Sequence, residues 1–141
     1  MHEFRSSICP LRSVVYLHVS PIRRTTLIPL QEVDVHTTKN VLYKAQIIRP
    51  TGSSSFYAEV VLHDSEFQPP FSSSVTFRQQ FQNEKAAYEQ AISWVKEHAQ
   101  KYGYPIDRIN NPCNCEFIEI EDQKAITASL GLNIPVQKNG G

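Results

Sequence analysis

Cysteines and histidines are the residues that could support metal or redox chemistry in this chain. It contains three cysteines and five histidines, and Cys113 and Cys115 are separated by one residue. A structural zinc site needs four tetrahedral ligands, commonly from two closely spaced pairs, whereas Cys9 and the histidines are scattered. Redox dithiols usually have two intervening residues. We therefore interpret Cys113 and Cys115 as free thiols where a loop meets a strand, and we expect no metal and no other cofactor.

Catalytic chemistry needs a nucleophile or a base held beside an orienting group. His63, Asp64 and Ser65 form the one compact set of this kind. Adjacent residues of an extended chain point in alternate directions, so this spacing does not align the three side chains. Gly52 stands alone in its loop, and the sequence has neither a P-loop nor a dinucleotide fingerprint. His98 is interpreted as a residue at the boundary of the core. The sequence therefore indicates a protein that is not an enzyme.

Composition predicts one folded domain with extensions. Of the 141 residues, 40% are hydrophobic and 20% are charged, which is ordinary for a folded chain. Fourteen basic and fourteen acidic side chains cancel, so no overall attraction to nucleic acid or to an anionic membrane is expected. However, residues 1–31 hold four arginines against one glutamate, and residues 107–124 hold five acids against two bases. This pattern fits either scattered solvated charges or a basic arm that meets a polyanion or an acidic partner.

The cellular compartment is predicted from the cysteine count and the apolar runs. An odd number of cysteines is unusual for a small secreted domain, so we predict a cytoplasmic protein. No uninterrupted apolar run approaches the ~18–20 residues of a membrane span. The run from Val14 to Leu17 is also too short for the core of a signal peptide.

Alternating apolar and polar residues predict a series of strands. Residues 13–19 are rich in β-branched and aromatic types, and a second segment, 27–35, is interrupted by Pro29. The pattern is stronger in 42–48 and 56–62, which are separated by turn residues and predict a hairpin. Residues 75–81 then predict a third antiparallel strand.

An amphipathic helix is predicted from Glu84 to Tyr102. Asn83 can accept a hydrogen bond from a first-turn amide, and Glu84 lies at the positive end of the helix dipole. Gly103 offers the left-handed residue that ends many helices, and Pro105 prevents continuation. The apolar stripe that should face the sheet comprises Ala87, Tyr88, Ala91, Ile92, Trp94, Val95, Ala99 and Tyr102.

A short strand and a short helix complete the prediction. Ile118 and Ile120 alternate with glutamates in a strand from Cys115 to Glu121, and a helix follows over residues 123–130. The predicted fold class is α+β, with an antiparallel sheet of three to five strands and one long helix packed on one face. We divide the chain into a basic N-terminal extension (1–40), an α+β domain (41–131) and a flexible tail (132–141).

The sheet face opposite the helix should be polar. It is predicted to present Lys44, Gln46, Glu59, Thr76, Arg78 and Gln80. The order of three strands and one helix over residues 42–102 resembles the β-β-β-α modules of integrase arm-binding domains and of plant AP2-type domains. This resemblance implies a sheet that lies in a DNA groove.

The leading functional prediction is a small non-catalytic binding module that acts as a subunit or regulator in a protein assembly. It follows from the lack of a reactive cluster and from the oppositely charged segments. One alternative is a nucleic-acid-binding protein that uses the polar sheet face and the basic N-terminal arm. A cysteine-based metal or redox site is the second alternative. The candidate contact residues for a partner or a nucleic acid are Arg23, Arg24, Lys44, Gln46, Thr76, Arg78 and Gln80.

Overall fold

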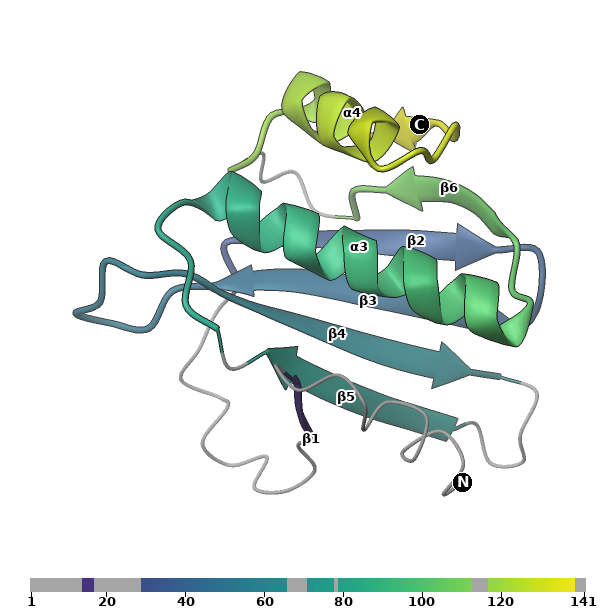
Figure 1. Cartoon of the computed structure of the whole chain (residues 1–141), viewed down its shortest axis with the longest axis horizontal. Coiled ribbons are helices and arrows are strands. Elements are labelled where there is room, and N and C mark those ends of the chain that lie inside the picture. The colour runs from purple at the N-terminus through teal and green to yellow at the C-terminus, as the bar shows by residue number, and fades with distance from the viewer. Residues whose placement is uncertain (1–13, 17–28, 66–70, 78, 113–116, 139–141) are drawn as a thin grey trace.

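The computed structural model describes residues 14–16, 29–65, 71–77, 79–112 and 117–138 (Figure 1). Its strands are β1 (Val14–Tyr16), β2 (Gln31–Thr37), β3 (Val41–Ile48), β4 (Tyr57–Asp64), β5 (Phe71–Phe77), β6 (Ile106–Asn110) and β7 (Val136–Gln137). Its helices are α3 (Glu84–Tyr102) and α4 (Ile120–Ser129). No helix within these described ranges is long and apolar enough to cross a membrane.

One seven-stranded sheet joins all the strands in the order β1-β5-β4-β3-β2-β6-β7. Every neighbouring pair is antiparallel except β6 and β7, which are parallel. The predicted α+β class is therefore confirmed, whereas the predicted antiparallel sheet of three to five strands is too narrow. The prediction gave too few strands because β6 and β7 are short and carry few buried apolar residues.

The central meander of β3, β4 and β5 was predictable because each strand alternates buried and polar residues. Ala45 pairs with Val60, and Val60 pairs with Val75, so one face of all three strands is apolar. These three side chains are at most 2% exposed. The next position on each strand faces the other way, which places polar residues together on the opposite face.

Helix α3 covers the apolar face of β3 and β4 (Figure 1). Its predicted bounds and both predicted caps are confirmed. The Asn83 side chain accepts a hydrogen bond from the Ala86 amide at 2.8 Å, and Gly103 has φ +73°. Ala87 and Ala91 are fully buried, so the helix axis can approach the sheet closely while Ile92 and Val95 fill the space beside them.

The strand predicted from Cys115 to Glu121 is wrong. Residues 115 and 116 lie outside the described residues, and Ile120 begins α4 rather than continuing a strand. Alternation of isoleucine with glutamate also suits a helix start, because Glu121 and Asp122 favour the positive end of the helix dipole. The helix predicted over residues 123–130 is present as α4, which begins three residues earlier than predicted, at Ile120. The last strands instead form a β6-α4-β7 crossover between parallel strands.

The predicted segment limits at residues 40 and 132 coincide with no break in the sheet. Strand β2 lies between β3 and β6, although it belongs to the segment assigned to the extension. Strand β7, within the segment assigned to the tail, pairs with β6, and its Val136 is buried.

Candidate functional site

A buried network of three side-chain amides holds α4 against the sheet. Gln31 of β2, Asn111 after β6 and Gln123 of α4 are each at most 1% exposed. The Asn111 carbonyl oxygen accepts hydrogen bonds from Gln31 and Gln123, each at 3.0 Å. Its amide nitrogen donates to the Gln123 carbonyl and to the backbone oxygen of Gln137, also at 3.0 Å. Each hydrogen-bonding position of the Asn111 amide therefore has a partner.

The same network fixes the segment that leads into α4. The backbone amide of Ile118 donates to the Gln31 side chain at 2.7 Å, and the Ile118 carbonyl accepts from Gln123 at 2.9 Å. Ile118 itself is 1% exposed and belongs to the main core. Because buried amides that lose a partner are costly, these contacts hold α4 in one position relative to β6 and β7.

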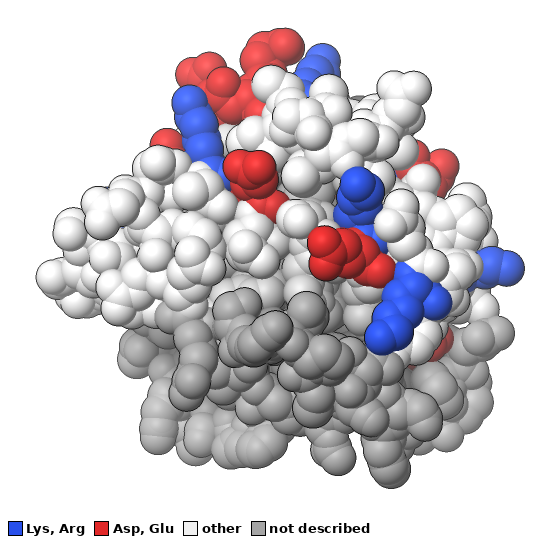
Figure 2. All heavy atoms as spheres, viewed as in Figure 1, with Lys and Arg blue, Asp and Glu red and all other residues white. Residues whose placement is uncertain are grey.

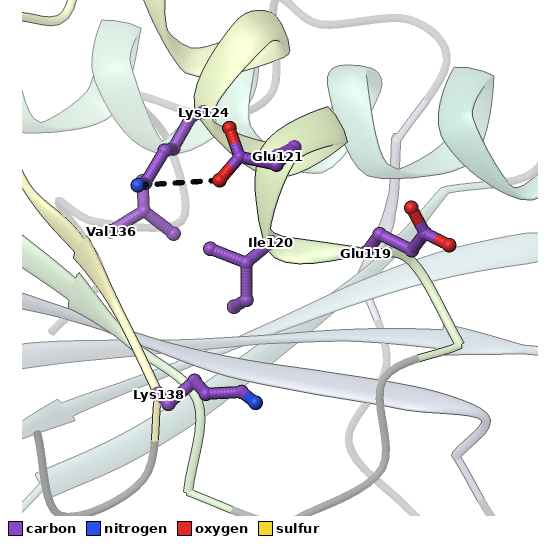
Figure 3. Close-up of a pocket in the computed structure, with 6 residues that line it drawn as sticks. All are labelled: Glu119, Ile120, Glu121, Lys124, Val136 and Lys138. Atoms are coloured by element: carbon purple, nitrogen blue, oxygen red, sulfur yellow. Dashed lines mark ion pairs between the residues drawn. The ribbon is translucent and has the colours of Figure 1, made fainter.

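A hollow at this edge lies between α4 and β7, and we call it the α4–β7 groove. It has a volume of about 580 Å³ and is lined by Glu119, Ile120, Glu121, Lys124, Val136 and Lys138. Figure 3 shows the Ile120 side chain directed into the space between the helix and the strand, with Lys138 on the opposite side. Two aliphatic side chains, Ile120 and Val136, therefore lie among four charged ones in the lining of the groove.

The rim of the α4–β7 groove carries charges of both signs. Glu121 and Lys124 form an ion pair at 3.6 Å, drawn as a dashed line in Figure 3, and both side chains are more than half exposed. Exposed pairs of this kind contribute little to stability. On the face that carries α3, acidic side chains gather over the start of α4, and the remaining charges are of mixed sign (Figure 2).

A second, smaller hollow lies at the end of α3, and we call it the α3-end groove. It has a volume of about 290 Å³ and is lined by Lys96, Ala99, Gln100, Gly103, Tyr104, Pro105, Ile106 and Leu132. The Lys96 amine donates to the Leu130 backbone oxygen at 2.7 Å, which joins α3 to the segment after α4.

The sheet face that points away from α3, here called the outer face, holds several of the predicted contact residues. Gln46 pairs with Glu59, and Glu59 pairs with Thr76, so these three side chains share the outer face. Lys44 lies on the same face, two residues from Gln46. Glu59 is only 5% exposed, which differs from the solvated position expected for it.

The charge of Lys44 is neutralised on the outer face. Its amine contacts Asp34 at 2.7 Å and Glu32 at 2.9 Å. Burial acts to lower the pKa of Lys44, but hydrogen bonds to Asp34 and Glu32 outweigh it and leave the pKa above its usual value. The ammonium group is therefore engaged by two carboxylates. Sequence reasoning missed this arrangement because the pairing of β2 with β3 was not predicted.

Of the other predicted contact residues, one falls within the described ranges. Gln80 follows β5 and is exposed. Arg23, Arg24 and Arg78 lie outside the described residues.

The structure describes only some of the residues that suggested metal or acid–base chemistry. Cys9, Cys113 and Cys115 lie outside the described residues. Among the residues that are described, no group of three or more His, Cys, Asp or Glu side chains could hold a metal ion. His63 and Asp64 end β4, where they pair with different strand positions on β3, Leu42 and Val41.

Comparison of the chain with protein-family models, with curated proteins and with solved structures finds no match. The resemblance of residues 42–102 to integrase arm-binding and AP2-type modules therefore concerns the order of elements alone. The sheet extends beyond that order on both sides, through β1 and through β2, β6 and β7.

Proposed function

We propose that the protein is a non-catalytic binding module that acts as a subunit or regulator of a protein assembly. The observation that carries this proposal is the α4–β7 groove of about 580 Å³, where Ile120 and Val136 lie between charged side chains. An apolar centre with a polar rim is the usual anatomy of a protein–protein contact.

The residues that line the groove favour recognition over reaction. The lining consists of two aliphatic residues, two glutamates and two lysines. These groups supply an apolar contact and ionic contacts of both signs, but they offer no thiol, hydroxyl or imidazole nucleophile. The walls are also fixed by the buried amides of Asn111 and Gln123, so the groove exists before a partner arrives. A preformed site loses less conformational entropy on binding.

The partner that fits best is a protein segment with one apolar side chain flanked by charges. The apolar side chain would contact Ile120 and Val136, a basic residue would lie toward Glu119, and an acidic residue toward Lys138. Charges at the rim chiefly determine specificity and association rate, while the apolar centre supplies most of the affinity.

Nucleic-acid binding through the outer face has weaker support. Lys44 is held by Glu32 and Asp34, and Glu59 lies on the same face. Phosphate recognition requires positive charges that can replace counterions, and the described part of this face offers few.

Site-directed photo-crosslinking in native extract at mild salt tests the proposed function. A photoreactive residue at Lys124, on the groove rim, should capture a defined partner, whereas one at the exposed Gln82 should not. Ile120→Asp should abolish the capture because it places a charge in the apolar centre. Leu132→Asp is the matched control, since Leu132 lines the other groove. Circular dichroism would verify that both variants fold.

Two results would contradict the proposal. One is recovery of the free monomer alone from every position. The other is capture that is equal at Lys124 and Gln82, or equally weakened by Ile120→Asp and Leu132→Asp, because such capture would not depend on the α4–β7 groove.

A further inference from the structure

The imidazole of His98 is enclosed between two aromatic rings of its own helix. It stacks on Trp94 with ring centroids 4.8 Å apart and an interplanar angle of 22°. The centroids of the His98 and Tyr102 rings are 4.6 Å apart, and the two ring planes meet at 37°. Trp94 and Tyr102 lie four residues before and after His98, which is the spacing that places side chains on one helix face. His98 is 7% exposed, so the stack excludes most water.

A hydrogen bond from the sheet orients this ring. The Tyr43 hydroxyl of β3 lies 2.7 Å from Nδ1 of His98, and Tyr43 is fully buried. Burial raises the pKa of Tyr43, so its hydroxyl keeps its proton and can donate to a neutral imidazole. A proton on Nδ1 would remove the acceptor, and the Tyr43 hydroxyl would have to reverse its role and accept a hydrogen bond from Nδ1.

Among the described residues, the rings that face His98 belong to Trp94 and to three tyrosines. Tyr43 faces it from β3, Tyr104 from the segment after α3, and Tyr102 from α3 itself. Burial first, and then the positive charge of Lys101, lower the pKa of His98 to about 4. An imidazole released into water regains an ordinary pKa of about 6.5. Acid therefore favours any state in which His98 is exposed.

The stack also holds the end of α3. Tyr102 and Tyr104 stack with centroids 6.2 Å apart, and the Tyr104 amide donates to the Ala99 backbone oxygen at 2.8 Å. Gly103 lies between them in the left-handed conformation. Ala99, Gly103 and Tyr104 also line the α3-end groove of about 290 Å³. Loss of the His98 contacts would therefore free one wall of this groove.

We infer that His98 is an acid-sensitive latch, whose protonation releases the end of α3, from Tyr102 to Tyr104, and opens the α3-end groove. The direction follows from linkage: an exposed His98 binds a proton between pH 6.5 and 4, whereas the enclosed one does not. From pH 7.5 to pH 5, the equilibrium constant for opening should rise about 30-fold. The sheet should stay folded over this range.

Trp94 makes the latch directly observable, because it is the one tryptophan of the chain and part of the stack. In the full chain, its fluorescence emission should shift between pH 6.5 and 4 while far-UV circular dichroism keeps the signal of the sheet. The amides of Gly103 and Tyr104, corrected for the intrinsic effect of pH on exchange, should lose about 30-fold in protection by pH 5. They should also remain less protected than the amides of Ala45 and Val60 in the sheet.

Two variants separate the latch from general acid sensitivity. His98→Gln keeps a hydrogen-bond acceptor for Tyr43 but does not titrate, so both pH effects should disappear. His36→Gln removes a half-exposed histidine of β2, and both effects should remain. If His98→Gln does not fold, the wild-type protein still tests the latch. Its test is whether the Gly103 and Tyr104 amides lose protection with acid while the sheet amides keep theirs.

Three results would overturn the latch. Trp94 emission and amide protection at the end of α3 could stay constant down to pH 4. Trp94 emission and the circular dichroism signal could change together, which would indicate global unfolding. Finally, folded His98→Gln could show the same pH effects as the wild type.

Discussion

The side-chain amide of Gln31 donates a hydrogen bond at 3.0 Å to the carbonyl oxygen of Asn111, although the two residues are 80 positions apart. The contact joins β2 to the end of β6, and Gln123 extends it to α4. A buried polar network of this kind is stabilising only when every member has its partners. The α4–β7 groove therefore depends on residues that do not line it.

Asn111→Ala should strongly destabilise the fold. It removes the Oδ1 acceptor of Gln31, deprives the Gln123 side chain of two hydrogen bonds and deprives the Gln137 carbonyl of one. Each buried group left without a partner costs ~1–3 kcal/mol, so we expect a total loss of at least ~2 kcal/mol. Urea unfolding measures this loss. Asn110→Ala is the control because Asn110 is half-buried and outside the network, and equal losses would contradict the prediction.

The ends of α3 offer an independent test of local stabilisation. Asn83→Ala removes the acceptor of the Ala86 amide and should lower the free energy of unfolding by ~1 kcal/mol. Gln82→Ala, at the exposed neighbouring position, should change it by less than ~0.5 kcal/mol. Thermal unfolding of both variants gives the comparison. A smaller effect for Asn83→Ala than for Gln82→Ala would show that the cap contributes little.

The sequence allowed α3 and the three strands before it to be predicted because their signals are local. Asn83, Gly103 and the apolar stripe between them all lie within one segment, and the strand alternation of β3 to β5 repeats over short distances. These signals need no knowledge of distant residues. Their prediction depended only on periodicity and caps.

The edge of the sheet could not be predicted in the same way. In strand β6, Asp107 is exposed, Ile109 is fully buried and the other three residues are half-buried. Its extended conformation depends on pairing with β2, which lies more than sixty residues earlier. Gln31, Asn111 and Gln123 look like ordinary surface amides in the sequence, because only the tertiary fold buries them. The α4–β7 groove was therefore not foreseen.

The outer face was predicted only in part. Lys44, Gln46 and Thr76 lie on it as alternation requires, but the effect of β2 on Lys44 was missed. An isolated lysine on a strand suggests affinity for phosphate, whereas one held by two carboxylates does not. Cross-strand register, rather than composition, determines this difference.

Tyr43→Phe should destabilise the protein without altering its packed volume much. It removes the hydroxyl that lies 2.7 Å from His98 Nδ1 but keeps the ring that contacts Trp94 edge-on. A typical intramolecular hydrogen bond contributes ~0.5–1.5 kcal/mol, and we expect a loss in this range at pH 7.5. Urea unfolding checks it. Tyr57→Phe, at a half-buried position of β4, is the matched control and should have a smaller effect.

Lys44→Ala should lower stability because Glu32 and Asp34 would lose the charge between them. The three side chains are between 14% and 25% exposed, so screening by water is incomplete. We expect a loss of ~1 kcal/mol that decreases as salt is added. Lys39→Ala, in the exposed turn between β2 and β3, should have little effect. A loss that does not depend on salt would argue for packing of the lysine chain rather than for its charge.

The same two variants test the nucleic-acid alternative. Fluorescence anisotropy with duplex and single-stranded DNA at low salt should show weak binding, and Lys44→Ala should not weaken it more than Lys39→Ala does. The reason is that Lys44 already contacts two carboxylates, so it has little charge to offer a phosphate. Strong binding that falls steeply with salt and depends on Lys44 would contradict this expectation. It would move the functional site to the outer face, and Arg23→Ala and Arg78→Ala would then be the next variants to measure.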